Sequence, residues 1–95
     1  MNNVTELKPK TKIEQAAKLI EFLNEKTGRN YRPTQVNLNF ILARFKEGYT
    51  EEDIRMVIAM KAREWQHDDV MSKYLRPATL FNCEKFNQYA GELGD

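Results

Sequence analysis

Residues 50–65 read TEEDIRMVIAMKAREW. The threonine stands three residues before Asp53, which is the spacing of a capping box at the start of a helix, and three acidic side chains in the first turn suit the helix dipole. Apolar residues then recur at three- and four-residue steps, namely Ile54, Val57 and Ile58. This period is typical of one helix face. Trp65 continues the face, so we expect it to anchor the core, and we expect the helix to end near residues 67–69.

Two further helices are predicted before this one. Residues 11–27 form the first, which ends before Gly28, and the second begins after a Thr34 cap and ends at Gly48. Both glycines stand where left-handed helix ends favour glycine, so we expect a positive φ at one or both. The predicted apolar stripes are Ile13, Ala16, Ala17, Ile20 and Leu23 in the first helix, and Val36, Leu38, Ile41, Leu42 and Phe45 in the second.

The C-terminal third is less regular. Residues 70–75 predict one or two helical turns before Pro77 interrupts them, and a final helix is expected from about residue 82 to residue 92, ending at Gly94. No stretch alternates apolar and polar residues as a half-buried strand does. The chain therefore predicts an all-α fold, a compact bundle of about four to five short helices.

Length and composition set the remaining limits. Ninety-five residues build one domain, which we place at residues 11–95 behind a flexible polar tail at residues 1–10. Fifteen Lys and Arg against fourteen Asp and Glu leave a net charge of +1, too little for a strong field towards DNA or membrane. The single cysteine excludes an internal disulfide, and no apolar run reaches the ~20 residues that span a bilayer. An intracellular protein is expected.

The sequence offers little for catalysis. His67, together with Asp68, Asp69 and Glu64, is the only cluster with metal-ligand chemistry, and a solvated helix end explains it better than converging ligands do. Cys83 stands near aromatic residues and is expected to be a packed thiol. No glycine-rich phosphate loop is present. We therefore expect a non-enzymatic binding protein with no metal and no cofactor.

Two connectors between helices combine basic and aromatic side chains. Cations beside exposed aromatic rings suit single-stranded nucleic acid, through phosphate contacts and base stacking. The alternative is that the tyrosines seal the core while the arginines pair with acids. The candidate residues for binding a partner or nucleic acid are Arg29, Tyr31 and Arg32 in the first connector and Lys73, Tyr74 and Arg76 in the second.

Three motifs in fixed order carry a resemblance to a known family. Residues 24–33 read NEKTGRNYRP, residues 47–53 read EGYTEED, and residues 73–81 read KYLRPATLF. In this order and spacing, across about residues 13–91, the chain resembles the conserved phage C-terminal domain at the end of bacteriophage and prophage replication proteins. It resembles more remotely the C-terminal domain of the primosomal DnaD proteins, of whose helix pattern Ile58 and Trp65 match in type.

The resemblance implies a setting in phage DNA replication. Such domains usually follow a DNA-binding, winged-helix-like region in replisome-organiser or helicase-loader-type proteins. This chain lacks such a region, so it is expected to be either a stand-alone small phage protein or an excised C-terminal domain, in the cytoplasm of a bacterial host.

The implied function is that of a replication accessory domain which contacts a helicase, its loader or single-stranded DNA. We favour a protein of the replication machinery over direct nucleic acid, because +1 is little charge for DNA binding. No membrane and no small-molecule substrate are expected. The alternative is a small phage regulator that binds and inhibits a host protein without nucleic acid, and a third interpretation is a structural oligomerisation module.

Overall fold

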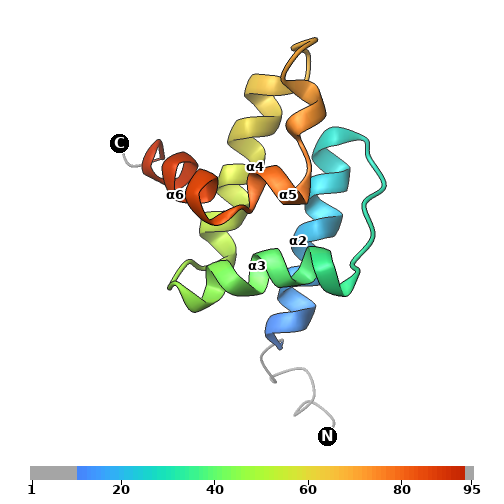
Figure 1. The fold of residues 1–95 in the computed structure, drawn as a ribbon. Coiled ribbons are helices and arrows are strands. Elements are labelled where there is room, and N and C mark those ends of the chain that lie inside the picture. Colours follow the sequence, from blue (N-terminus) through green and yellow to red (C-terminus); the bar gives the residue numbers. More distant parts are fainter. Residues whose placement is uncertain (1–10, 94–95) are drawn as a thin grey trace, which may run out of the picture.

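A computed structural model of the chain describes residues 11–93. The predicted tail at residues 1–10 and the predicted helix end at Gly94 lie outside the described residues. Every regular element within residues 11–93 is a helix, which confirms the predicted all-α fold (Figure 1). The elements are α2 (Lys12–Thr27), α3 (Gln35–Lys46), α4 (Glu51–Trp65), the 3-10 turn η1 (Ser72–Tyr74), α5 (Pro77–Leu80) and α6 (Cys83–Gly91).

Side chains just outside the helices fix where the three long helices begin. The Thr50 hydroxyl accepts a hydrogen bond from the Asp53 N–H at 3.1 Å, and the Asp53 carboxylate accepts one from the Thr50 N–H at 2.9 Å, so the predicted capping box is confirmed. Thr11 builds the same box for α2, and Thr34 caps α3. These caps satisfy backbone N–H groups that the first helical turn leaves without partners.

Two glycines end helical segments as predicted. Gly28 closes α2 with a φ of 72°, and Gly48, just after α3, has a φ of 102°. Both values lie in the left-handed region that a Cβ disfavours. The chain therefore turns sharply after α2 and again after α3.

The core lies where α2, α3 and α4 pack together and where α5 and α6 close over them. In Figure 1, α3 crosses in front of α2, and α5 and α6 lie above α3. The buried apolar side chains form one contiguous cluster. Its members are Ala16, Leu19, Ile20, Leu23, Leu38, Ile41, Phe45, Ile54, Val57, Ile58, Leu75, Leu80, Phe81, Phe86 and Tyr89.

The C-terminal third follows the prediction with one change. The helical turn η1 ends before Pro77 as predicted, and the change is that Pro77 then starts a further short helix, α5, where its missing N–H costs nothing and its fixed φ suits the helix. Asn82 then caps α6 through a hydrogen bond from the Lys85 N–H to its side chain. This cap starts α6 one residue after the predicted position.

Two residues of the predicted buried stripes are exposed. Ile13 is 57% exposed and Val36 is 65% exposed. Ile13 lies in the first turn of α2, whose blue end extends past α3 in Figure 1. Val36 lies in the first turn of α3, on the face opposite the buried Leu38. Helical periodicity gives the direction of a face, but the neighbouring elements decide how far along the helix that face is covered.

Candidate binding site

Hydrogen bonds join the two basic–aromatic connectors side by side. The Arg29 guanidinium donates to the Ser72 carbonyl at 2.9 Å, and the Tyr31 hydroxyl donates to the Leu75 carbonyl at 3.0 Å. The Tyr31 backbone is itself fixed by Asn24, whose amide side chain makes two 2.8 Å hydrogen bonds to it. Arg29 and Tyr31 therefore hold the second connector against the end of α2.

The second connector presents three candidate residues together. Lys73 and Arg76 are exposed, and Tyr74 between them is partly buried. The Lys73 Nζ lies 5.4 Å and the Arg76 Cζ 5.1 Å from the centre of the Tyr74 ring, distances typical of cation–π contacts. Arg76 also donates from Nε to the Thr79 hydroxyl at 2.9 Å. Neither cation forms an ion pair with an acid among the described residues.

Arg32 is the candidate that this arrangement leaves apart. Its backbone carbonyl accepts a hydrogen bond from the Asn37 side chain at 2.9 Å, which fixes it at the start of α3. Its side chain is exposed, and within residues 11–93 its guanidinium makes no ion pair. Arg32 therefore belongs to the start of α3 and not to the surface around Tyr74.

A pocket beside Tyr74 has three aromatic side chains among its six lining residues. It has a volume of about 330 Å³. Trp65 and Tyr89 meet edge to face in its wall, with ring centres 5.7 Å apart and an interplanar angle of 85°. We call it the aromatic pocket, and its lining residues are Trp65, Met71, Tyr74, Thr79, Lys85 and Tyr89.

Trp65 lies at the edge of the core, whereas the sequence predicted a core anchor. It is partly buried and packs against the core from outside, while another part of it lines the aromatic pocket. It is the last residue of α4, so the helix offers no further turn to cover it. The expectation of a central core anchor is therefore only partly met, and this position also makes Trp65 available for binding.

Lys61 lies buried beside the aromatic pocket. Its Nζ pairs with the Glu92 carboxylate at 2.9 Å and the Glu64 carboxylate at 3.0 Å, and it lies 5.1 Å from the Trp65 ring centre and 4.6 Å from that of Tyr89. Burial opposes the charged form, but the hydrogen bonds to Glu92 and Glu64 outweigh it and raise the pKa of Lys61. Lys61 therefore joins α4 to the end of α6 as a paired cation, and its Nζ lies over both aromatic rings.

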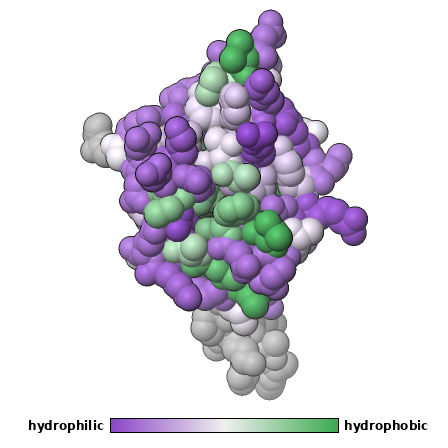
Figure 2. Space-filling model, viewed as in Figure 1, coloured by the Kyte–Doolittle hydropathy of each residue, from purple (hydrophilic) through white to green (hydrophobic). Residues whose placement is uncertain are grey.

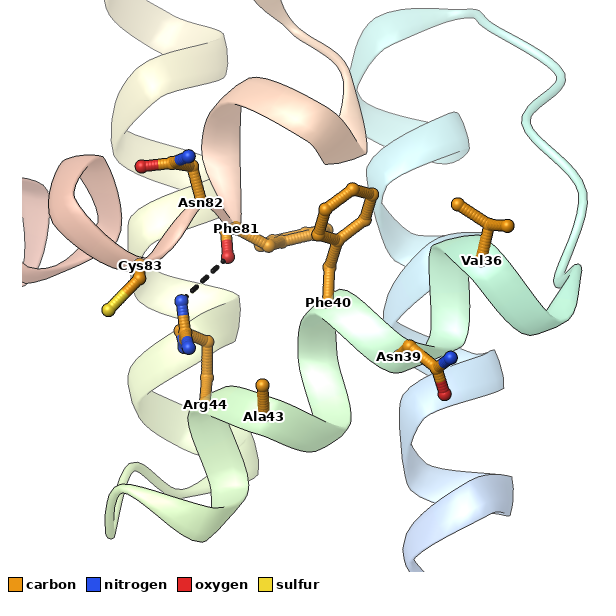
Figure 3. Close-up of a pocket in the computed structure, with 8 residues that line it drawn as sticks. All are labelled: Val36, Asn39, Phe40, Ala43, Arg44, Phe81, Asn82 and Cys83. Atoms are coloured by element: carbon orange, nitrogen blue, oxygen red, sulfur yellow. Dashed lines mark hydrogen bonds between the residues drawn. The ribbon is translucent and has the colours of Figure 1, made fainter.

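A second concave surface lies along α3 (Figure 3). It has a volume of about 370 Å³. We call it the α3 groove, and it is lined by Val36, Asn39, Phe40, Ala43 and Arg44 of α3 and by Phe81, Asn82 and Cys83 of the α5–α6 corner. Figure 2 shows a hydrophobic band on the face of the molecule where α3 lies.

The α3 groove was not predicted from the sequence, although a signal for it exists. Val36, Phe40 and Ala43 follow one another at steps of four and three residues, which places them on one face of α3. That face differs from the one that carries Leu38, Ile41 and Phe45. The two stripes overlap in the sequence, so residue order alone predicts one apolar stripe that includes Val36, instead of two apolar faces.

Cys83 corrects another prediction. It is exposed, not packed, because it is the first residue of α6 and lies at the outer corner after α5. Its Sγ donates to the Glu47 carboxylate at 3.3 Å. That hydrogen bond is the main cause that raises the pKa of the Cys83 thiol. A raised pKa lowers the thiolate fraction that a nucleophile needs.

The acidic cluster near the end of α4 has a structural role. Asp68 accepts hydrogen bonds from the backbone N–H groups of Val70 and Met71, both at 2.8 Å, and so fixes the turn before η1. Across residues 11–93, no group of three or more His, Cys, Asp or Glu side chains converges as metal ligands would. None of the helices within residues 11–93 combines the length and the apolar composition that a membrane span requires.

The fold and its surfaces define a small all-helical domain with an aromatic pocket, a basic connector beside it and a separate apolar groove. The sequence profile of a family described as "conserved phage C-terminus" matches residues 19–91. The chain belongs to this family of phage domains. Neither a curated protein nor a solved structure gives a match.

Proposed function

We propose that this chain is a non-enzymatic accessory domain of phage DNA replication in the cytoplasm of the bacterial host. The small net charge favours a protein partner, but the rings and cations at the aromatic pocket favour single-stranded DNA, and we propose that DNA binds there. One observation carries the proposal. Partly exposed rings of Trp65 and Tyr74 line a pocket together with the cation Lys85, and the exposed cations Lys73 and Arg76 lie close to the Tyr74 ring. Membership of the phage family and the resemblance to replication proteins supply the biological setting.

The chemistry of the pocket suits an unpaired nucleotide. An unstacked base gains about 1–3 kcal/mol by stacking on an aromatic side chain, whatever its identity. Lys73 and Arg76 are exposed close to Tyr74, where they can reach phosphate oxygens. The net charge of +1 is small, so we expect modest affinity and a small number of phosphate contacts.

The way the connectors are joined supports binding at this surface. Hydrogen bonds from Arg29 and Tyr31 fix the backbone of residues 72–75 before any partner arrives. A fixed surface loses little conformational entropy when it binds. Arg29 and Tyr31 are therefore positioning residues, and the contact falls to Lys73, Tyr74 and Arg76.

A replication protein is the second candidate for the same surface. Trp, Tyr and Arg are the residue types that dominate binding energy in protein interfaces, and Trp65, Tyr74 and Arg76 supply one of each. A helicase or helicase loader with an acidic segment would suit the exposed cations. The regulator that inhibits a host protein would use the same residue types without a role in replication.

Trp65 provides a direct test because it is the only tryptophan in the chain. Titration with a labelled oligo-dT should quench its fluorescence and raise the anisotropy of the label at the same midpoint. Replacement of Lys73 and Arg76 by alanine should weaken binding and reduce the slope of log affinity against log salt by about 0.7 for each phosphate that the protein no longer neutralises.

Lys18→Ala is the matched control, because Lys18 is an exposed cation on α2 and lines a different surface. It removes a positive charge and should leave the affinity nearly unchanged. No binding of single strands at low salt refutes DNA as the partner. If a replicative helicase or its loader then changes Trp65 fluorescence and the Lys73 and Arg76 variant does not respond, the protein partner replaces it.

A further inference from the structure

Three side chains of the aromatic pocket offer hydrogen-bond donors. The Trp65 indole and the Lys85 ammonium can only donate, and Lys85 makes no ion pair within residues 11–93. The Thr79 hydroxyl accepts a hydrogen bond from Arg76 Nε at 2.9 Å, so its own hydrogen is left to donate. An occupant of the pocket therefore meets N–H and O–H groups.

Acceptors are scarce in the same wall. No lining residue has a carboxylate or an amide side chain, and the two tyrosine hydroxyls can either donate or accept. Five of the six lining residues have a backbone carbonyl that already accepts a hydrogen bond from an N–H two or three residues later, at 2.9–3.4 Å. These residues are Trp65, Met71, Tyr74, Thr79 and Tyr89. The pocket therefore matches a group that presents acceptor atoms.

The four bases differ in this property. Stacking on aromatic rings tolerates every base, so a preference has to come from the polar edge of the base. Thymine and guanine carry a carbonyl oxygen, which accepts, where cytosine and adenine carry an amino group, which donates. A donor in the wall can bond the carbonyl, whereas beside an amino group it is left without a partner, which costs free energy.

Contacts within the chain hold the wall in place before a base arrives. The Trp65 ring meets Tyr89 edge to face, with ring centres 5.7 Å apart, and the Lys61 Nζ lies 5.1 Å from its centre. Thr79 is partly buried in α5, and its hydroxyl is bonded to Arg76. Groups fixed in this way discriminate better, because they cannot rearrange to satisfy the wrong base.

We infer that the aromatic pocket selects a base with a carbonyl group, thymine or guanine, over cytosine and adenine, and that Thr79 and Lys85 determine this specificity. The inference rests on the proposed binding of single-stranded DNA and names the bases that this site prefers. Met71 adds an apolar side chain to the wall, which suits the methyl group of thymine.

The first test compares two pyrimidines. Anisotropy titrations with labelled oligo-dT and oligo-dC of equal length, at one low salt concentration, should show about three to ten times tighter binding of oligo-dT, the effect of one hydrogen bond. Two further strands separate the carbonyl from the methyl group. Oligo-dU lacks the methyl group and should bind nearly as tightly as oligo-dT, whereas an oligonucleotide of 5-methyl-dC should bind like oligo-dC.

Two substitutions test the residues. Thr79→Val keeps the shape of the side chain and removes the hydroxyl, so it should weaken binding of oligo-dT and leave binding of oligo-dC unchanged. Thr79→Ser is its matched control and should keep the preference. Lys85→Met should also reduce the ratio of the two affinities, whereas Lys18→Met, which removes an exposed cation outside the pocket, should not. Thermal melts verify that each variant is folded.

The outcomes separate the inference from the proposed function. Equal affinities for oligo-dT and oligo-dC overturn the inference and leave DNA binding intact. Oligo-dU that binds as weakly as oligo-dC also overturns it, because the methyl group would then be the feature recognised. An unchanged ratio in both Thr79→Val and Lys85→Met refutes the assigned residues. No binding of any strand overturns the proposed function and the inference with it.

Discussion

Removal of the Tyr31 hydroxyl tests whether the two connectors act as one unit. Tyr31→Phe keeps the ring, which packs against the core, and deletes a hydrogen bond to the Leu75 carbonyl, 44 residues away in the sequence. It also removes the acceptor of a 3.3 Å hydrogen bond from Arg29. The interaction is partly buried, so one intramolecular hydrogen bond contributes about 1 kcal/mol, and the Leu75 carbonyl is left without its partner as well. We expect a total destabilisation of about 1–2 kcal/mol.

The assay is equilibrium unfolding in urea, followed by far-ultraviolet circular dichroism. A domain of this size has a total stability of about 5–10 kcal/mol, so the expected destabilisation moves the midpoint measurably. Tyr49→Phe is the matched control, because its hydroxyl makes an exposed hydrogen bond to Asn87. Solvent replaces that hydrogen bond readily, and the control should be destabilised by about 0.5 kcal/mol or less.

A double-mutant cycle with Arg29 identifies the cause. Arg29→Gln removes the hydrogen bond to the Ser72 carbonyl. If the two side chains hold the same segment, the destabilisations from Arg29→Gln and Tyr31→Phe should not add, and the coupling should be about 0.5 kcal/mol or more. Fully additive effects, or a Tyr31→Phe effect no larger than that of Tyr49→Phe, would refute the idea that these bonds fix residues 72–75.

Three other substitutions test separate features. Gly28→Ala should lower the free energy of unfolding in urea by about 1 kcal/mol, because a Cβ disfavours the positive φ even though the space around Gly28 is open. Gly91→Ala in α6 is the control and should be neutral or slightly stabilising, so equal effects of the two substitutions would contradict this explanation. Trp65→Ala should lower the free energy of unfolding by about 2 kcal/mol, which is less than the roughly 3–5 kcal/mol expected when the fully buried Phe86 is replaced by alanine. A larger loss for Trp65→Ala than for Phe86→Ala would place Trp65 inside the core. Because the pKa of Lys61 is raised above its ordinary value, Lys61 stabilises the fold fully at a pH below that ordinary pKa, and this stabilisation is lost as the pH rises through the pKa of the folded state. The melting temperature of Lys61→Met should therefore fall less than that of the original chain as the pH is raised into the alkaline range. Identical dependence of the melting temperature on pH in the two proteins would refute the stabilising role of the charged Lys61.

The helices and their ends could be predicted from the sequence because they depend on interactions within one or two turns. A threonine cap, such as Thr50, bonds a backbone N–H three residues away, and Gly28 and Gly48 turn the chain through their own φ angles. These interactions connect near neighbours along the chain. Capping boxes, left-handed ends and helical periodicity could therefore be read from residue order alone.

The candidate site could be predicted only in part. The sequence marked Lys73, Tyr74 and Arg76 as a basic–aromatic group, and the structure places them together beside a pocket. It marked Arg29 and Tyr31 by the same rule, yet these two hold the second connector in place. Residue type alone does not separate a contact residue from a positioning residue, because both roles use a cation and a ring.

Tertiary packing decided the rest, because it determines which part of each helical face finds a neighbour. Lys61 lies on the apolar side of α4 and is buried because Glu92, just after α6, reaches it. Trp65 continues the same side but ends the helix, so one part of it is left to line a pocket. Val36 is exposed and Phe40 is only partly buried, because α5 and α6 cover part of α3 and leave a groove beside it. Periodicity fixes the direction of a side chain, whereas its burial depends on elements that are distant in sequence and near in space.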